Sequence, residues 1–256
     1  MTLSDALFDV PAPTSPAEGP APLHPVARLL DLAGEYTRHN DALDVLDDLS
    51  APDPGAYARS AQHLAEQTTA AINAVVDLRL FDHANLSNAL TRLTQVAYLA
   101  DAAGHHDLPS SREFTAFAPE AVVDSAALIA AHQRRRRSGH APEPDDRLDA
   151  ARQAALHEIA LGHVVRTSSQ GRDYVHSTGT HVPIGTLRSL EAGELTERVP
   201  KSAPPAYAGG GRQDRIRLSR AGAAALATVI ARAPAGSPPG PPPAPTPMKA
   251  TTRRRS

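Results

Sequence analysis

The chain has 256 residues and a formal net charge of −2, and 41% of its residues are hydrophobic although only 4% are aromatic. It contains no cysteine, which excludes a disulfide framework and cysteine-based zinc sites. We find neither a secretory signal nor a run that approaches the roughly 18 apolar residues of a membrane span. We therefore expect a soluble, cytoplasmic protein with no membrane association.

Charge is divided unevenly along the chain. Residues 1–133 carry six basic and 18 acidic residues, a net of −12, whereas residues 134–256 carry 20 basic and 10 acidic residues, a net of +10. One interpretation is that the basic half meets a polyanion such as double-stranded DNA. The other is that each half is simply solvated and that the two halves dock.

The N-terminal half predicts a helical bundle. Residues 1–24 are rich in Pro and Ala and predict a disordered arm. Helical periodicity then predicts an acidic bundle over 25–137. Its helices are expected at 26–38, 42–49, 56–80, 85–103 and 120–137. Asp41 is the expected N-cap of the second helix, and the apolar stripes indicate a core or a dimer interface.

Four consecutive arginines end the last helix of the predicted bundle, namely Arg134, Arg135, Arg136 and Arg137. Positive charge at a helix C-terminus is stabilised by the helix macrodipole by about 0.3–1 kcal/mol. The guanidinium group also matches phosphate oxygens, so the same run is a candidate phosphate contact.

Residues 138–146 predict a linker, and residues 147–233 predict a small α+β unit. Its first helix is expected at 147–161, with Asp145 or Asp146 as its N-cap, and 164–180 predicts a β-hairpin that turns at Gln170-Gly171. A helix at 182–192 should end at Gly193 in a positive-φ conformation. Two strands around a Pro/Gly-rich loop follow, and Ser219 is the expected N-cap of a helix over 220–232.

This order of helix, glycine, strand, loop, strand and helix resembles the second half of a winged-helix domain. The resemblance rests on 186–195 (TLRSLEAGEL), on the basic loop and on 216–222, and it covers roughly a sixth to a quarter of the chain. It departs from the family in one respect, because the hairpin at 164–180 stands where a second helix and a tight turn are usual. The resemblance implies a helix in the major groove and a wing at the phosphates, although many winged-helix relatives bind protein instead.

The resemblance and the charge pattern together give a set of candidate nucleic-acid contacts. They are Thr186, Arg188 and Ser189 on the helix, Lys201, Arg212, Arg215 and Arg217 around the wing, and the four arginines at 134–137. Most should contact phosphate, and Arg188 is the best candidate for a base contact because arginine pairs bidentately with guanine. The nearby Glu191, Glu194 and Glu197 repel phosphate and favour the binding of protein if they interleave with the arginines.

No other group of residues in the sequence indicates a catalytic or metal site. His157, His163, His176 and His181 with Asp173 lack the close spacing of a metal site, and no nucleophile or P-loop motif is present. We therefore expect no metal, no cofactor and no enzymatic activity. Residues 234–256 predict a disordered, Pro-rich, basic tail.

Two hypotheses follow. The first is a DNA-binding accessory or transcriptional regulatory protein that contacts DNA through a winged-helix-like C-terminal domain. Its helical N-terminal domain would form a homodimer or hold a protein partner. The second is a non-enzymatic protein-interaction or scaffold protein that binds no nucleic acid.

Overall fold

The computed structural model describes residues 24–47, 54–80, 83–136, 148–169, 171–205 and 210–232. Within them the protein is mainly helical and has a small four-stranded antiparallel sheet, as the predicted fold class required. The predicted arms at 1–24 and 234–256 and the predicted linker at 138–146 lie outside the described residues, apart from His24.

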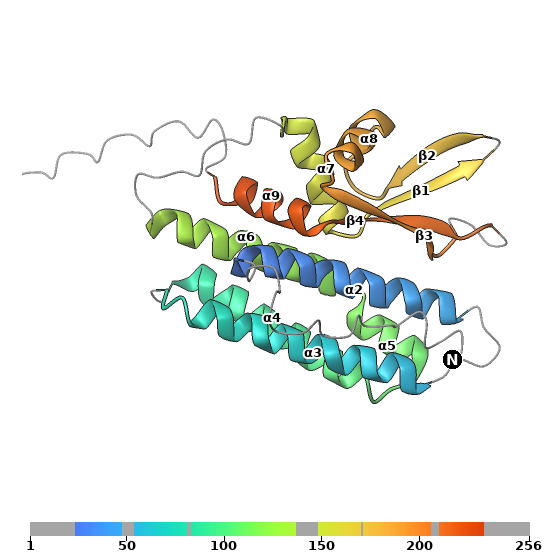
Figure 1. Ribbon diagram of the computed structural model, residues 1–256. Helices are drawn as coiled ribbons and strands as arrows, with labels where there is room; N and C mark the ends of the chain where they lie inside the picture. The colour runs from blue at the N-terminus through green and yellow to red at the C-terminus, as the bar shows by residue number, and fades with distance from the viewer. Residues whose placement is uncertain are drawn as a thin grey trace, which may run out of the picture.

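The N-terminal helices form the predicted bundle. They are α2 (Pro25–Asp47), α3 (Pro54–Val76), α4 (Ala84–Ala103), α5 (Leu108–Thr115) and α6 (Ala118–Arg136). Figure 1 shows α2 and α6 lying between α3 and α4 on one side and the C-terminal elements on the other. Helix α2 therefore has two buried faces, and 15 of its residues are buried, polar residues among them.

Helix α2 corrects one prediction. It runs without interruption from Pro25 to Asp47, so the expected break before residue 42 and the role of Asp41 as an N-cap are both wrong. The apolar stripe continues through Leu43 and Leu46, which are fully buried. Asp41 lies inside the helix because a distant arginine, described below, binds its carboxylate.

Helix α5 was not predicted. It has eight residues, and its N-cap Asp107 accepts a hydrogen bond from the backbone N–H of Ser110. Together with α6 it makes the segment Leu108–Arg135, which is long and apolar enough by composition to cross a membrane. Half of the most apolar part of this segment is buried inside the protein, with Val122 and Ile129 in the core. This burial is compatible with a core helix of a soluble protein.

The C-terminal elements alternate helices with two hairpins. They are α7 (Ala150–Ala160), β1 (Val164–Ser169), β2 (Arg172–Ser177), α8 (Ile184–Ala192), β3 (Thr196–Ala203), β4 (Gln213–Leu218) and α9 (Arg220–Ile230). The strand order is β2-β1-β4-β3, with every neighbouring pair antiparallel. The predicted β-hairpin is confirmed, since Ser169 pairs with Arg172 and Gly171 has a φ of 74°, while Gln170 of the predicted turn lies outside the described residues.

The helix ends in this part were predicted with mixed success. Ser219 caps α9 as expected, and its hydroxyl accepts a hydrogen bond from the N–H of Gly222. The N-cap of α7 is Asp149, so the expectation of Asp145 or Asp146 is wrong. Gly193 does follow α8 but has a φ of −86°, and Glu194 takes the positive φ of 55° instead.

The two faces of the sheet have different neighbours. Ile216 of β4 is fully buried and belongs to a core cluster that also includes Leu29 and Leu30 of α2 and Leu226 of α9. That cluster is continuous across the bundle and the C-terminal elements. The alternate residues of β4, Arg215 and Arg217, lie on the opposite face and are directed at α2. The sheet thus presents a polar face to an acidic helix.

Candidate functional site

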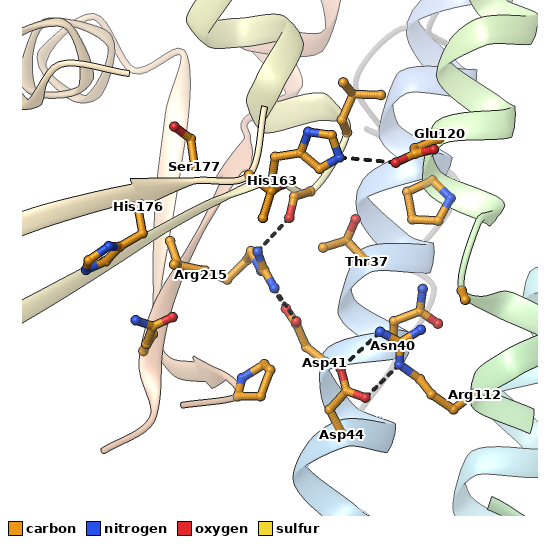
Figure 2. A pocket seen from close by; sticks show the side chains of 18 of the residues that line it. Thr37, Asn40, Asp41, Asp44, Arg112, Glu120, His163, His176, Ser177 and Arg215 are labelled. Carbon is orange, nitrogen blue, oxygen red and sulfur yellow. Dashed lines mark hydrogen bonds and ion pairs between the residues drawn. The ribbon is translucent and has the colours of Figure 1, made fainter. Parts of the chain in front are cut away.

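A cleft of about 470 Å³ opens between the bundle and the sheet. Helix α2 and the start of α6 line one side, and the α7–β1 turn, β2 and β4 line the other (Figure 2). The β1–β2 hairpin lies on the sheet side and contributes Val165, His176 and Ser177 to the lining. The cleft therefore depends on both halves of the chain.

The ion pair between Asp41 and Arg215 lies at the floor of the cleft. The Arg215 guanidinium donates to both carboxylate oxygens of Asp41, at 2.8 Å from Nε and 2.5 Å from Nη2. Its Nη1 also donates to the carbonyl oxygen of Gly162 at 2.6 Å. The side chains are only 4% and 11% exposed. Burial raises the pKa of Asp41, and the hydrogen bonds and charge of Arg215 act in the opposite direction.

Two further ionic contacts border the same cleft. Arg112 of α5 binds Asp44 of α2 bidentately, with distances of 2.6 and 3.1 Å. His163, in the turn before β1, lies between Glu158 of α7 at 3.0 Å and Glu120 of α6 at 3.3 Å. Both imidazole nitrogens can donate at once only when the ring is protonated. The contact between His163 and Glu120 joins the C-terminal elements to the bundle, whereas Arg112 and Asp44 connect two helices of the bundle.

A second polar contact lies further along α2. Arg217 borders a cavity of about 40 Å³ together with Asp31 and Glu35 of α2 and Glu197 of β3. Burial raises the pKa of Asp31 and of Glu35, and burial lowers the pKa of Arg217. The docking of an acidic front on a basic back, one of the two interpretations of the charge asymmetry, is therefore what these residues do.

The predicted wing residues do not share one surface. Arg215 and Arg217 face α2, whereas Lys201 and Arg212 are exposed at the turn end of the β3–β4 hairpin. Lys201 has a φ of 52° where the register between Val199 and Ala203 shifts. Such a bulge redirects the strand, so β3 continues through Pro200 where the sequence predicted a loop.

The predicted helix contacts lie on α8. The Arg188 side chain is 63% exposed and its guanidinium donates to Asp173 of β2 at 3.3 Å, while Thr186 and Ser189 are half-buried. Hydrogen bonds from Ser168 and Arg166 hold the pKa of Asp173 well below its usual range. Arg166 also pairs with Glu191, at 3.2 Å. The charge of one of the three glutamates near α8 is therefore balanced by an arginine of β1.

One end of the sheet carries exposed basic residues, a grouping that the sequence alone did not indicate. Antiparallel pairing of β1 with β4 places the β1–β2 turn and the β3–β4 turn at the same end. Arg172, Lys201 and Arg212 are all exposed there. In the described part of the chain none of these three side chains is paired with a carboxylate. We call this set of three residues the hairpin end. Arg172 was not among the predicted contacts, although its position just after the predicted turn was a usable signal.

The four-arginine run lies at the other end of the molecule. Arg134 donates from Nη1 to the carbonyl oxygens of Ile230, at 2.9 Å, and of Arg232, at the C-terminus of α9. Helix α9 leads away from the hairpin end, because it follows the opposite end of β4 (Figure 1). Arg135 is exposed, Arg136 is the last residue of α6, and Arg137 lies outside the described residues. The candidate nucleic-acid contacts are thus divided among four places, namely α8, the hairpin end, the face of β4 against α2, and the end of α6.

Metal binding has no support in the described residues, where no group of three or more His, Asp or Glu side chains could hold an ion. Comparison of the chain with protein-family models, with curated proteins and with solved structures gave no match.

Proposed function

We propose that the protein is a DNA-binding accessory or regulatory protein whose C-terminal elements contact the duplex. The observation that carries the proposal is the hairpin end, where Arg172, Lys201 and Arg212 are exposed and have no carboxylate partner among the described residues. Cations of this kind neutralise phosphates and release counterions, which favours binding to DNA. Arg188 of α8 adds a further exposed cation near β2, on the face opposite to Arg172, because its partner Asp173 is the next residue of the strand.

Helix α8 supports a groove contact in addition to phosphate contacts. It precedes a hairpin and a further helix in the order that resembles a winged-helix domain. Glu191 is bound by Arg166 and Asp173 is bound by three groups, so both carboxylates are screened on the protein side. Arg188 is exposed enough to exchange its single contact with Asp173 for a phosphate or a guanine edge.

The bundle would then serve for dimerisation or for binding a protein partner. Arg215 and Arg217 have no part in this interface, because they dock the sheet on α2. Their role would be to fix the orientation of the hairpin end relative to the bundle. Because the core is continuous across both parts, the intact chain is the appropriate material for every test.

The test is fluorescence anisotropy of a labelled duplex titrated with the full chain at several salt concentrations. We expect affinity to fall steeply with salt, with a log–log slope of about −0.9 for each phosphate contact. The double variant Arg172→Gln/Arg212→Gln should reduce the slope by about 2. Its matched control is Arg79→Gln/Arg92→Gln, which removes the same charge from exposed positions of the N-terminal half and should leave the slope unchanged. No binding by the wild type at about 50 mM salt would refute the proposal.

The protein-interaction hypothesis has one observation in its favour. Arg166, Arg198 and Arg215 of the C-terminal elements form ion pairs with carboxylates of the protein, and the bundle exposes two large aromatic side chains, Tyr98 at 74% and Phe117 at 76%. If the chain binds no duplex, this alternative becomes the preferred function. A Tyr98→Ala/Phe117→Ala variant would then be expected to lose self-association or partner binding measured by sedimentation.

A further inference from the structure

The charged groups of the cleft are already matched with one another. Asp41 is bound by Arg215, and Asp44 is bound by Arg112. Glu120 contacts His163 at 3.3 Å. A charged ligand that entered the cleft would have to replace one of these contacts, at the cost of separating an existing pair. The cleft is therefore better suited to an uncharged molecule.

Gln213 is the exception to this pairing. It begins β4, its backbone pairs with Ala203, and it lies on the same face as Arg215 because the two are two residues apart. The residue is only 5% exposed and it lines the cleft. Within the described chain its side-chain amide makes no hydrogen bond. The amide atoms of Gln213 are not among the fully enclosed side-chain atoms that lack a partner, so they reach the cleft, where a ligand can form hydrogen bonds with them.

We propose that the cleft binds a small uncharged molecule with an adjacent hydrogen-bond donor and acceptor, such as a nucleobase or a carboxamide, and that Gln213 is its anchor. A glutamine amide offers a carbonyl acceptor beside an N–H donor, and such an amide pairs bidentately with the edge of adenine. The volume of about 470 Å³ lies within the range typical of small-molecule sites. Gly162, Val165, Pro204 and Pro205 supply apolar surface and backbone around the polar anchor.

This site does not depend on DNA binding. It would place a ligand at the junction where α2 meets β4, against the ion pair that orients the sheet. Its failure and the failure of the proposed function are measured separately, because the test below contains no nucleic acid.

The experiment is isothermal titration of the full chain with adenine, with nicotinamide and with nicotinate. Nicotinamide and nicotinate have nearly the same shape but differ in charge. We expect adenine or nicotinamide to bind and nicotinate to bind at least about tenfold more weakly than nicotinamide. If neither neutral probe binds, or if nicotinate binds as tightly as nicotinamide, the proposal is overturned.

Two variants assign the binding to the amide. Gln213→Met keeps the length of the side chain without its polar group and should weaken binding by about tenfold or more. Gln213→Asn keeps the amide but withdraws it by one methylene, and we expect a smaller loss. The matched control Gln95→Met makes the same change at an exposed position of α4 and should bind as the wild type does. Equal binding by Gln213→Met and the wild type would exclude Gln213 as the anchor.

The thermal stability of Gln213→Met provides an independent readout. Replacing an unpaired buried amide by an apolar group of the same shape should leave the midpoint of unfolding unchanged or raise it. A large fall in the midpoint would show that the amide has a structural partner, and it would contradict the proposal even if the variant could not be titrated.

Discussion

Removing either member of the Asp41–Arg215 pair should destabilise the fold far more than removing both. In Arg215→Met the Asp41 carboxylate, 4% exposed, is left without its guanidinium partner. Breaking a buried pair in this way typically costs about 3–5 kcal/mol. In Asp41→Leu the arginine keeps its hydrogen bond to the Gly162 carbonyl, so we expect a somewhat smaller cost, about 2–4 kcal/mol.

The double variant Asp41→Leu/Arg215→Met has no unpaired buried charge. Replacing a whole buried pair by apolar side chains is often neutral or stabilising, so we expect it to lie within about 1 kcal/mol of the wild type. The coupling energy of the cycle should then be at least about 3 kcal/mol. Urea unfolding followed by circular dichroism measures each free energy of unfolding, with a common m-value as the check that two-state behaviour is retained.

A matched control cycle uses Arg92 and Asp124, which also form an ion pair, at 2.9 Å, but whose side chains are 45% and 63% exposed. Each single substitution there should cost less than about 1 kcal/mol. Two results would refute the reasoning for the buried pair. One is that both of its single variants cost less than about 1 kcal/mol. The other is that their costs simply add in the double variant.

Three further outcomes are expected from unfolding measurements. Burial lowers the pKa of His39 from 6.5 to about 3. Between these two pH values the imidazole is therefore protonated in the unfolded chain and neutral in the folded chain. Stability should therefore fall on acidification through that window by about 1.4 kcal/mol per pH unit, a slope that urea titrations of His39→Gln at pH 4–7 should lack. The same substitution to Ala at two helix glycines should have opposite signs. Gly34→Ala meets nothing within 4 Å and should stabilise by about 0.5–1 kcal/mol, whereas the Cβ of Gly222→Ala would lie 1.9 Å from the carbonyl oxygen of Leu195 and should cost about 1–3 kcal/mol or more. Ser219→Ala removes the N-cap of α9 and should lower the thermal midpoint through a loss of about 1 kcal/mol, and an unchanged midpoint would contradict the role of this cap.

Features set by neighbouring residues were predictable from the sequence. The hairpin that turns at Gly171 and the cap at Ser219 follow from local backbone and side-chain chemistry, and both were confirmed. Asp41 shows where local rules fail. An aspartate before a new apolar stripe favours an N-cap, but Asp41 lies inside a continuous helix and its carboxylate binds Arg215, 174 residues away.

The candidate site was less accessible to prediction than the helices. The charge asymmetry indicated docking of the two halves without indicating which residues would meet. The alternation of β4 did separate Arg215 and Arg217 from Ile216, yet it could not show that an acidic helix covers their face. Gln213 carried no signal at all, because its importance depends on burial beside a cleft that both halves of the chain create.

The distance in sequence between Asp41 and Arg215 has a consequence for synthesis on the ribosome. Helix α2 emerges early, but the strand that neutralises its buried carboxylate is made 174 residues later. At translation rates of about 5–20 residues per second, this interval lasts roughly 10–35 seconds. During that time one side of the nascent bundle exposes both apolar surface and an uncompensated acid. The newly made N-terminal half therefore cannot complete this face until β4 has been synthesised.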